Sequence, residues 1–131
     1  MKTIAIIARF LLGLIFLVFG LNGFLHFLSM PAPTGVAGQF MGALFVSHYL
    51  VAVFAIQVVA AILFLVNRYV PLALVLLGPV IFNILLFHIL MAPSGLPLAL
   101  IVTVLWIVVF VSAQWAFRGL WQARTQIEVA K

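Results

Sequence analysis

Residues 4–27, with the sequence IAIIARFLLGLIFLVFGLNGFLHF, decide the fold class of this chain. The stretch contains one charged residue, Arg9, and as a helix it is long enough to cross the roughly 30 Å hydrocarbon core of a bilayer. Near its end, Asn22 and His26 are four residues apart and therefore lie on one helical face. We predict a transmembrane helix that carries polar groups at its C-terminal end.

The composition extends this interpretation to the whole chain. Of its 131 residues, 69% are hydrophobic and 5% are charged, whereas charged residues make up about a quarter of a soluble domain. So little polar surface cannot cover a water-soluble fold. The chain has no cysteine, which excludes disulfides, thiolate metal sites and thiol chemistry carried by this chain.

Four apolar segments are recognisable, and each forms about 22 residues or roughly 33 Å of helix. They are residues 4–27, 44–66, 70–91 and 96–117. Pro71 and Pro97 stand where a first helical turn tolerates proline, and residues 93–95 form a tight turn. We therefore predict one domain over residues 1–131, an all-α membrane protein with a four-transmembrane-helix bundle. Residues 29–40, SMPAPTGVAGQF, are expected to form an uncharged loop that is able to dip toward the bilayer surface.

The basic residues predict the orientation. They lie at the start of the chain, in the second connection and after the fourth segment, at Lys2, Arg9, Arg68, Arg118, Arg124 and Lys131. In a four-span topology these positions fall on one side, so both termini should be cytoplasmic. Arg9 should extend its side chain to the near interface.

Residues 118–131 are predicted to form a basic cytoplasmic tail on the anionic leaflet. Arg68, Arg118 and Arg124 would lie at the membrane surface, with Trp115 and Trp121 in an aromatic belt. The net charge of +5 comes from six Lys and Arg against the single Glu128. Because no basic face interleaved with aromatic residues exists, the expected partner of this charge is the bilayer and not a nucleic acid.

The glycines of the first segment have helix-packing spacing. Gly13, Gly20 and Gly23 lack the context of a phosphate-binding loop, and they predict a smooth surface for a neighbouring helix. The chain has no Asp, its single Glu lies in the tail, and no Lys lies in a span. Carboxylate metal sites and paired-carboxylate catalysis are therefore not expected, which favours a chain that is not an enzyme by itself.

All three histidines are predicted at one membrane level, the outer one: His26, His48 and His88. One interpretation is that each imidazole is satisfied by a nearby backbone or headgroup. A second is a joint pocket for a quinone headgroup, assisted by Asn22 and Asn83. Haem or metal ligation is a weaker alternative, because no HxxxH-like pair on a single helix supports it. Gln57 is expected to form an interhelical hydrogen bond near mid-membrane, and Gln114 lies near the opposite side and outside this group.

The stretches ARFLLGLIFLVFGLNGFLHF (8–27) and GPVIFNILLFHILMAP (78–93), in a chain with four spans, resemble the DoxX family of small bacterial inner-membrane proteins. The resemblance implies a four-helix bundle in the bacterial cytoplasmic membrane, associated with redox or sulfur metabolism. Some members are linked to a thiosulfate:quinone oxidoreductase, and others to oxidoreductase complexes with soluble partners. No catalytic residues follow from it.

Two functions are consistent with these patterns. The first is a small integral subunit or anchor that packs against a larger, redox-related membrane complex through its apolar surfaces. The second is a membrane oxidoreductase component that binds a quinone, or less readily haem or a metal, in the outer pocket of His26, His48 and His88. Transport by so short a chain ranks last, since it has no discontinuous-helix signature.

Overall fold

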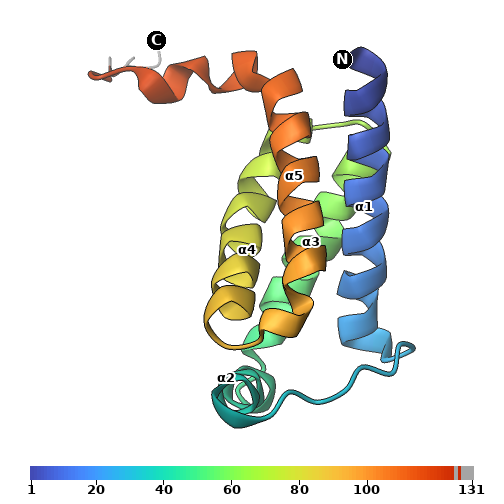
Figure 1. The fold of residues 1–131 in the computed structure, drawn as a ribbon. Helices are drawn as coiled ribbons and strands as arrows, with labels where there is room; N and C mark the ends of the chain where they lie inside the picture. The colour runs from blue at the N-terminus through green and yellow to red at the C-terminus, as the bar shows by residue number, and fades with distance from the viewer. Residues whose placement is uncertain (126, 128–131) are drawn as a thin grey trace.

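The computed structural model describes residues 1–125 and residue 127, so Glu128 and Lys131 of the predicted tail lie outside the described residues. Within the described part the chain is helical and has no strand (Figure 1). The elements are α1 (Lys2–Leu25), α2 (Gly35–Val46), α3 (Tyr49–Leu65), α4 (Val70–Leu90), the 3₁₀ turn η1 (Pro93–Gly95), α5 (Leu96–Ser112) and the 3₁₀ segment η2 (Gln114–Trp121).

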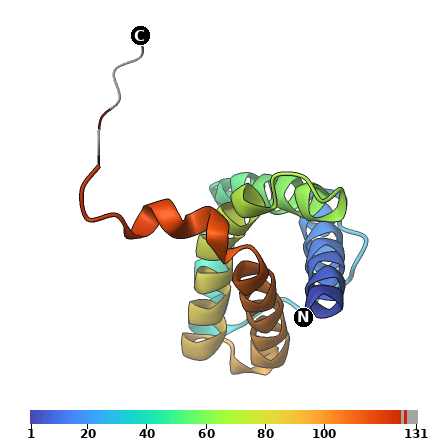
Figure 2. The same ribbon diagram turned by 90° about the horizontal axis from the view of Figure 1, so that it is seen from above.

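Four helices form the bundle. Helix α1 packs on α3, α3 on α4, α4 on α5, and α5 returns to α1, which closes the ring seen from above in Figure 2. Helix α2 lies across one end of the bundle, and η2 leaves the other end sideways (Figure 1). The N-terminus and the connection between α3 and α4 lie at the same end as η2.

Three helices are long and apolar enough to cross a membrane. They are α1, α4 and the continuous stretch Pro93–Ser112, and the pair α2 and α3 provides a fourth if it counts as one bent span. The bend between α2 and α3 is 84°. The prediction of an all-helical chain is thus confirmed for the described residues, and three or four of the helices are long and apolar enough to span a membrane.

The connection between the first two spans differs from the prediction. Residues 29–40 were expected to form a loop, and the second span to run through residues 44–66, but Gly35–Val46 is a helix of its own. It is held by packing, because Ala37 is buried and the Phe40 ring lies 5.9 Å from the ring of Phe87 in α4. Such tertiary contacts override the low helix propensity of glycine. His48, at φ 61°, then breaks the helix before α3 begins.

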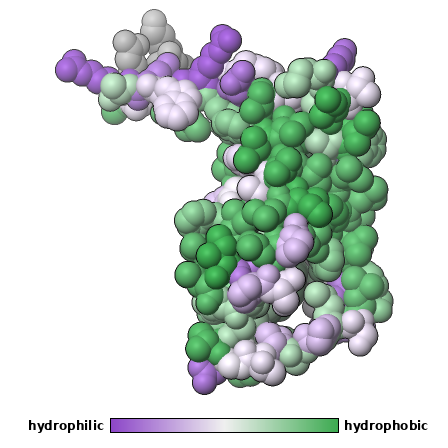
Figure 3. Space-filling model, in the orientation of Figure 1, coloured by the Kyte–Doolittle hydropathy of each residue, from purple (hydrophilic) through white to green (hydrophobic). Residues whose placement is uncertain are grey.

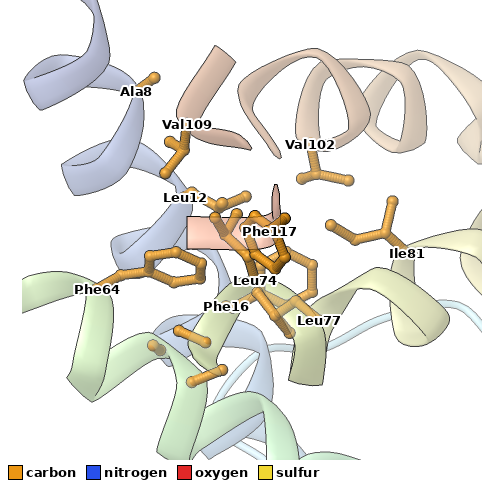
Figure 4. Close-up of a cluster of buried hydrophobic side chains, with 13 residues drawn as sticks. Ala8, Leu12, Phe16, Phe64, Leu74, Leu77, Ile81, Val102, Val109 and Phe117 are labelled. Carbon is orange, nitrogen blue, oxygen red and sulfur yellow. The ribbon is translucent and has the colours of Figure 1, made fainter. Parts of the chain in front are cut away.

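The predicted ends of the other spans were too long. The first span ends at Leu25 because His26 adopts a left-handed conformation at φ 52°, and the fourth ends at Ser112 and not at Phe117. After Ser112 the chain turns into η2, and Phe117 is buried in the hydrophobic core, with its ring 5.0 Å from that of Phe110 (Figure 4). The predicted fourth span therefore includes half of a segment that lies across the bundle end.

The core is narrow and is built from small and medium side chains. Its fully buried members include Leu12, Phe64, Leu74 and Leu77, packed among alanines (Figure 4). Far more large apolar side chains are exposed than buried, and they cover the sides of the bundle (Figure 3). Water would not tolerate so large a continuous apolar surface, whereas hydrocarbon covers it at no cost.

Helix α1 meets α3 through its three glycines. A Cβ on Gly20 would lie 2.9 Å from Val58 Cγ2, and one on Gly13 would lie 2.9 Å from Leu65 Cγ. A Cβ on Gly23 would run into the ring of Phe54. The glycines thus let the two helices approach closely, which raises van der Waals contact where no hydrophobic effect drives helix association.

We predict that Gly20→Leu lowers the free energy of unfolding by about 2 kcal/mol, because the added side chain overpacks the contact with α3. Gly42→Leu is the matched control, since a Cβ at Gly42 has no atom within 4 Å. Unfolding in a mixed detergent, followed by circular dichroism, measures both variants. An equal effect of the two substitutions would contradict the close α1–α3 contact.

Candidate functional site

The three histidines lie at the end of the bundle opposite the N-terminus. His26 follows α1, His48 precedes α3, and His88 is in the last turn of α4, and all three of these helix ends lie at the end of the bundle that α2 covers (Figure 1). The three histidines therefore share one end of the bundle. Their individual environments decide whether they form one site.

His26 and His48 are helix-boundary residues. Both have left-handed backbones, a conformation in which histidine is several-fold enriched among residues other than glycine. The His26 N–H closes the last turn of α1 on the Asn22 carbonyl at 2.9 Å. Both side chains are exposed, and neither forms a hydrogen bond within the described part of the chain.

His88 has a different environment and is half-buried in the turn between α4 and α5. Its Nδ1 lies 3.0 Å from the Ala92 carbonyl oxygen, so it donates in the tautomer that carries the Nδ1 proton. The ring stands edge-on to Phe87 and covers Gly95, where a Cβ would collide with it. His88 therefore holds the turn before α5, and Gly95 provides the space for its ring.

The two asparagines bond within their own segments. The Asn22 side-chain oxygen accepts the Leu28 N–H at 2.7 Å and so orders the chain after α1. The Asn83 amide donates to the Pro79 carbonyl at 2.8 Å, one turn earlier in α4, and its side chain is exposed on the outside of the bundle. Asn22 and Asn83 are thus not directed into a common pocket with each other.

Four of the predicted pocket residues lie near one end of the bundle, and Asn83 lies about two turns before the end of α4. No hydrogen bond joins any two of these five side chains among the described residues. In the same residues no group of three or more His, Cys, Asp or Glu side chains is placed to hold a metal ion. Gln57 is buried against α1, with its Cβ 3.3 Å from where a Cβ on Gly20 would lie, but its side chain does not form the expected interhelical hydrogen bond with any described residue.

The charged residues that the structure describes lie at the opposite end. Arg9 reaches from α1 to the C-terminal end of α3, where its guanidinium donates to the Phe64 carbonyl, and it lies 4.6 Å from the centre of the Phe10 ring. A cation is favourable beside the last carbonyls of a helix. Arg68 lies in the neighbouring turn, and Arg118 and Arg124 lie in and after η2.

A single hydrogen bond links α5 to α4 inside the bundle. Pro79 has no N–H, so the Val75 carbonyl of α4 has no helical donor, and the bond from α5 is made to the neighbouring Leu74 carbonyl. The indole N–H of Trp106 donates to the Leu74 carbonyl in that region at 3.0 Å, and its ring rests beside Gly78. The same ring stacks on Phe110 with 5.2 Å between centres, which continues the contact toward η2.

A pocket of about 360 Å³ opens where α5 turns into η2. Phe110, Gln114, Arg118 and Trp121 line it. Sequence reasoning placed Arg118 and Trp121 at the membrane surface but missed Phe110 and left Gln114 out. The turn after Ser112 brings these residues together, and no hydropathy pattern in the sequence marks this turn.

Comparisons of the chain with protein-family models, curated proteins and solved structures find no match. The resemblance to the DoxX family therefore stays a prediction.

Proposed function

We propose that the protein is a small integral subunit or anchor that packs against a larger, redox-related complex in the bacterial cytoplasmic membrane. All four bundle helices would cross, and both termini would be cytoplasmic, because the charged residues cluster at the end that holds the N-terminus. The DoxX resemblance supports the same architecture and a redox context. The partner subunit would bind to the outside of the bundle, and the function would not depend on an internal site.

The observation that carries this proposal is an exposed polar residue on the outer face of α4. Asn83 uses one amide hydrogen on the Pro79 carbonyl, and its side-chain oxygen accepts no hydrogen bond from the described residues. An exposed amide in hydrocarbon is costly, and such groups are satisfied by hydrogen bonds between helices. A partner helix beside Asn83 would supply the missing donor.

The neighbours of Asn83 form a surface suited to helix packing, which we call the α4 face. Its exposed members recur at three- and four-residue intervals, at Leu72, Val75, Pro79, Phe82, Leu86 and Ile89. Phe82 is its largest member and is 62% exposed. Bulky aromatic residues at the centre of a contact supply much of the binding energy of protein interfaces.

A photo-crosslinking amino acid tests the α4 face directly. With benzoyl-phenylalanine in place of Phe82 in native membranes, we expect a crosslinked adduct to a different membrane polypeptide. Benzoyl-phenylalanine in place of Ile107, which is exposed on the outside of α5, is the matched control. It should give little crosslinked adduct to another polypeptide. Asn83→Leu should reduce the Phe82 adduct several-fold, because it removes the polar group that the partner would satisfy.

The outcome that contradicts this proposal is equally clear. Equal crosslinking from positions 82 and 107 would mean that α4 faces lipid in the same way as α5. Adducts whose mass is only that of a second copy of the chain would show a homo-oligomer in place of a larger complex.

The alternative is a component of a membrane oxidoreductase that binds a quinone between the exposed imidazoles of His26 and His48, with His88, Asn22 and Asn83 nearby. The observation in its favour is that two imidazoles at the same bundle end are exposed and form no hydrogen bond with the described residues. Imidazole N–H groups donate well to quinone carbonyls. Haem or a metal would need a closer grouping of ligands than the described residues provide.

The alternative predicts quinone in the protein purified from its native membrane. Organic extraction and mass spectrometry should then find it in stoichiometric amount, and a variant with His26→Asn, His48→Asn and His88→Gln should lose it. Asparagine is suitable at the first two positions because it tolerates the left-handed backbone. Absence of quinone from the unmodified protein would eliminate this function and leave the subunit proposal intact.

A further inference from the structure

The pocket between α5 and η2 has features of a lipid-binding site. Its base is the partly buried Phe110, whose ring contacts those of Trp106 and Phe117, and its other lining residues, Gln114, Arg118 and Trp121, are exposed. A cationic group, an amide and an indole thus lie beside an aromatic ring. This combination provides donors for an anion at one side and apolar contact at the other.

The orientation of η2 places this pocket at the bundle end where the described charges lie. The segment runs sideways out of the bundle, and Figures 1 and 2 show it as an arm beyond α5. Phe117 is buried in the core, whereas Trp115, Leu120 and Trp121 are exposed. Large apolar residues beside arginines are typical of a segment that lies in the headgroup region of a membrane.

The charge of the pocket is positive. The part of the chain that the structure describes contains no acidic side chain, so none of its residues neutralises Arg118. A guanidinium forms paired hydrogen bonds with the oxygens of a phosphate. The Gln114 amide lies on the same wall and supplies a further donor.

We propose that this pocket binds the headgroup of an anionic phospholipid, with the phosphate on Arg118 and Gln114 and the glycerol region against Trp121. Figure 3 shows open space beneath the arm, next to the apolar side of the bundle, which we call the hollow. The acyl chains of a lipid bound at the arm would lie in this hollow. The bound lipid would then fill the angle between η2 and the bundle and stabilise the arm. This site is independent of the α4 face and of the quinone alternative.

The test is lipid binding by the purified full chain, followed by native mass spectrometry. The probes are phosphatidylglycerol and phosphatidylcholine with identical acyl chains, and inorganic phosphate as competitor. We expect the unmodified chain to prefer phosphatidylglycerol by about fivefold, the ratio that one basic residue near an anionic surface provides. Arg118→Gln should abolish this preference, and Arg118→Lys should keep part of it because the charge remains without the planar donor pair.

Arg124→Gln is the matched control, since it removes the same charge beyond the pocket and should leave the preference unchanged. Equal losses from Arg118→Gln and Arg124→Gln would overturn the proposal by showing diffuse attraction to the basic end. Equal binding of the two lipids would overturn it as well. Displacement of the lipid by millimolar inorganic phosphate would show a free-anion site in place of a lipid site. If Arg118→Gln does not fold, Gln114→Leu replaces it, with a weakened preference as the expected result.

Discussion

The structure depends on one constraint, the absence of water around most of its surface. In hydrocarbon a backbone or side-chain polar group has to find its partner within the protein. Thr103 and Ser112 in α5 donate to carbonyls of their own helix, at 2.7 Å and 2.6 Å, and Asn83 does so in α4. The described charged residues lie at one end of the bundle, where headgroups and water reach them. The sides of the bundle between its two ends are correspondingly apolar (Figure 3).

Contacts inside the bundle follow from the same constraint. Without a hydrophobic driving force between helices, cohesion comes from close packing and from a few hydrogen bonds between helices. The glycines of α1 provide the packing against α3, and the Trp106 indole provides a hydrogen bond from α5 to α4. Trp106 also stacks on Phe110, so the contact that holds α5 to α4 extends to the base of the pocket at η2. A continuous set of aromatic contacts therefore connects the basic end of the bundle with its core.

The sequence predicted long helices well and their interruptions poorly. The first and third spans were correct to within two residues because twenty or more apolar residues have few alternatives in a bilayer. Helix α2 was missed because its three glycines and the prolines before it favour a loop, whereas its packing on α3 and on Phe87 of α4 stabilises the helix. The level of the histidines followed from topology. Their backbone roles did not, because a left-handed residue such as His48 has no signature in hydropathy.

The central proposal is that the chain crosses the membrane four times, with α3 as the second crossing and the charged end inside. Because the chain has no cysteine, single cysteines report topology without background. A membrane-impermeant maleimide added to intact spheroplasts should label Ser29→Cys and Ser94→Cys before lysis. Val66→Cys and Gln122→Cys should react only after lysis. Labelling of position 66 together with position 29 before lysis would show that α3 does not complete a crossing, and would contradict this account.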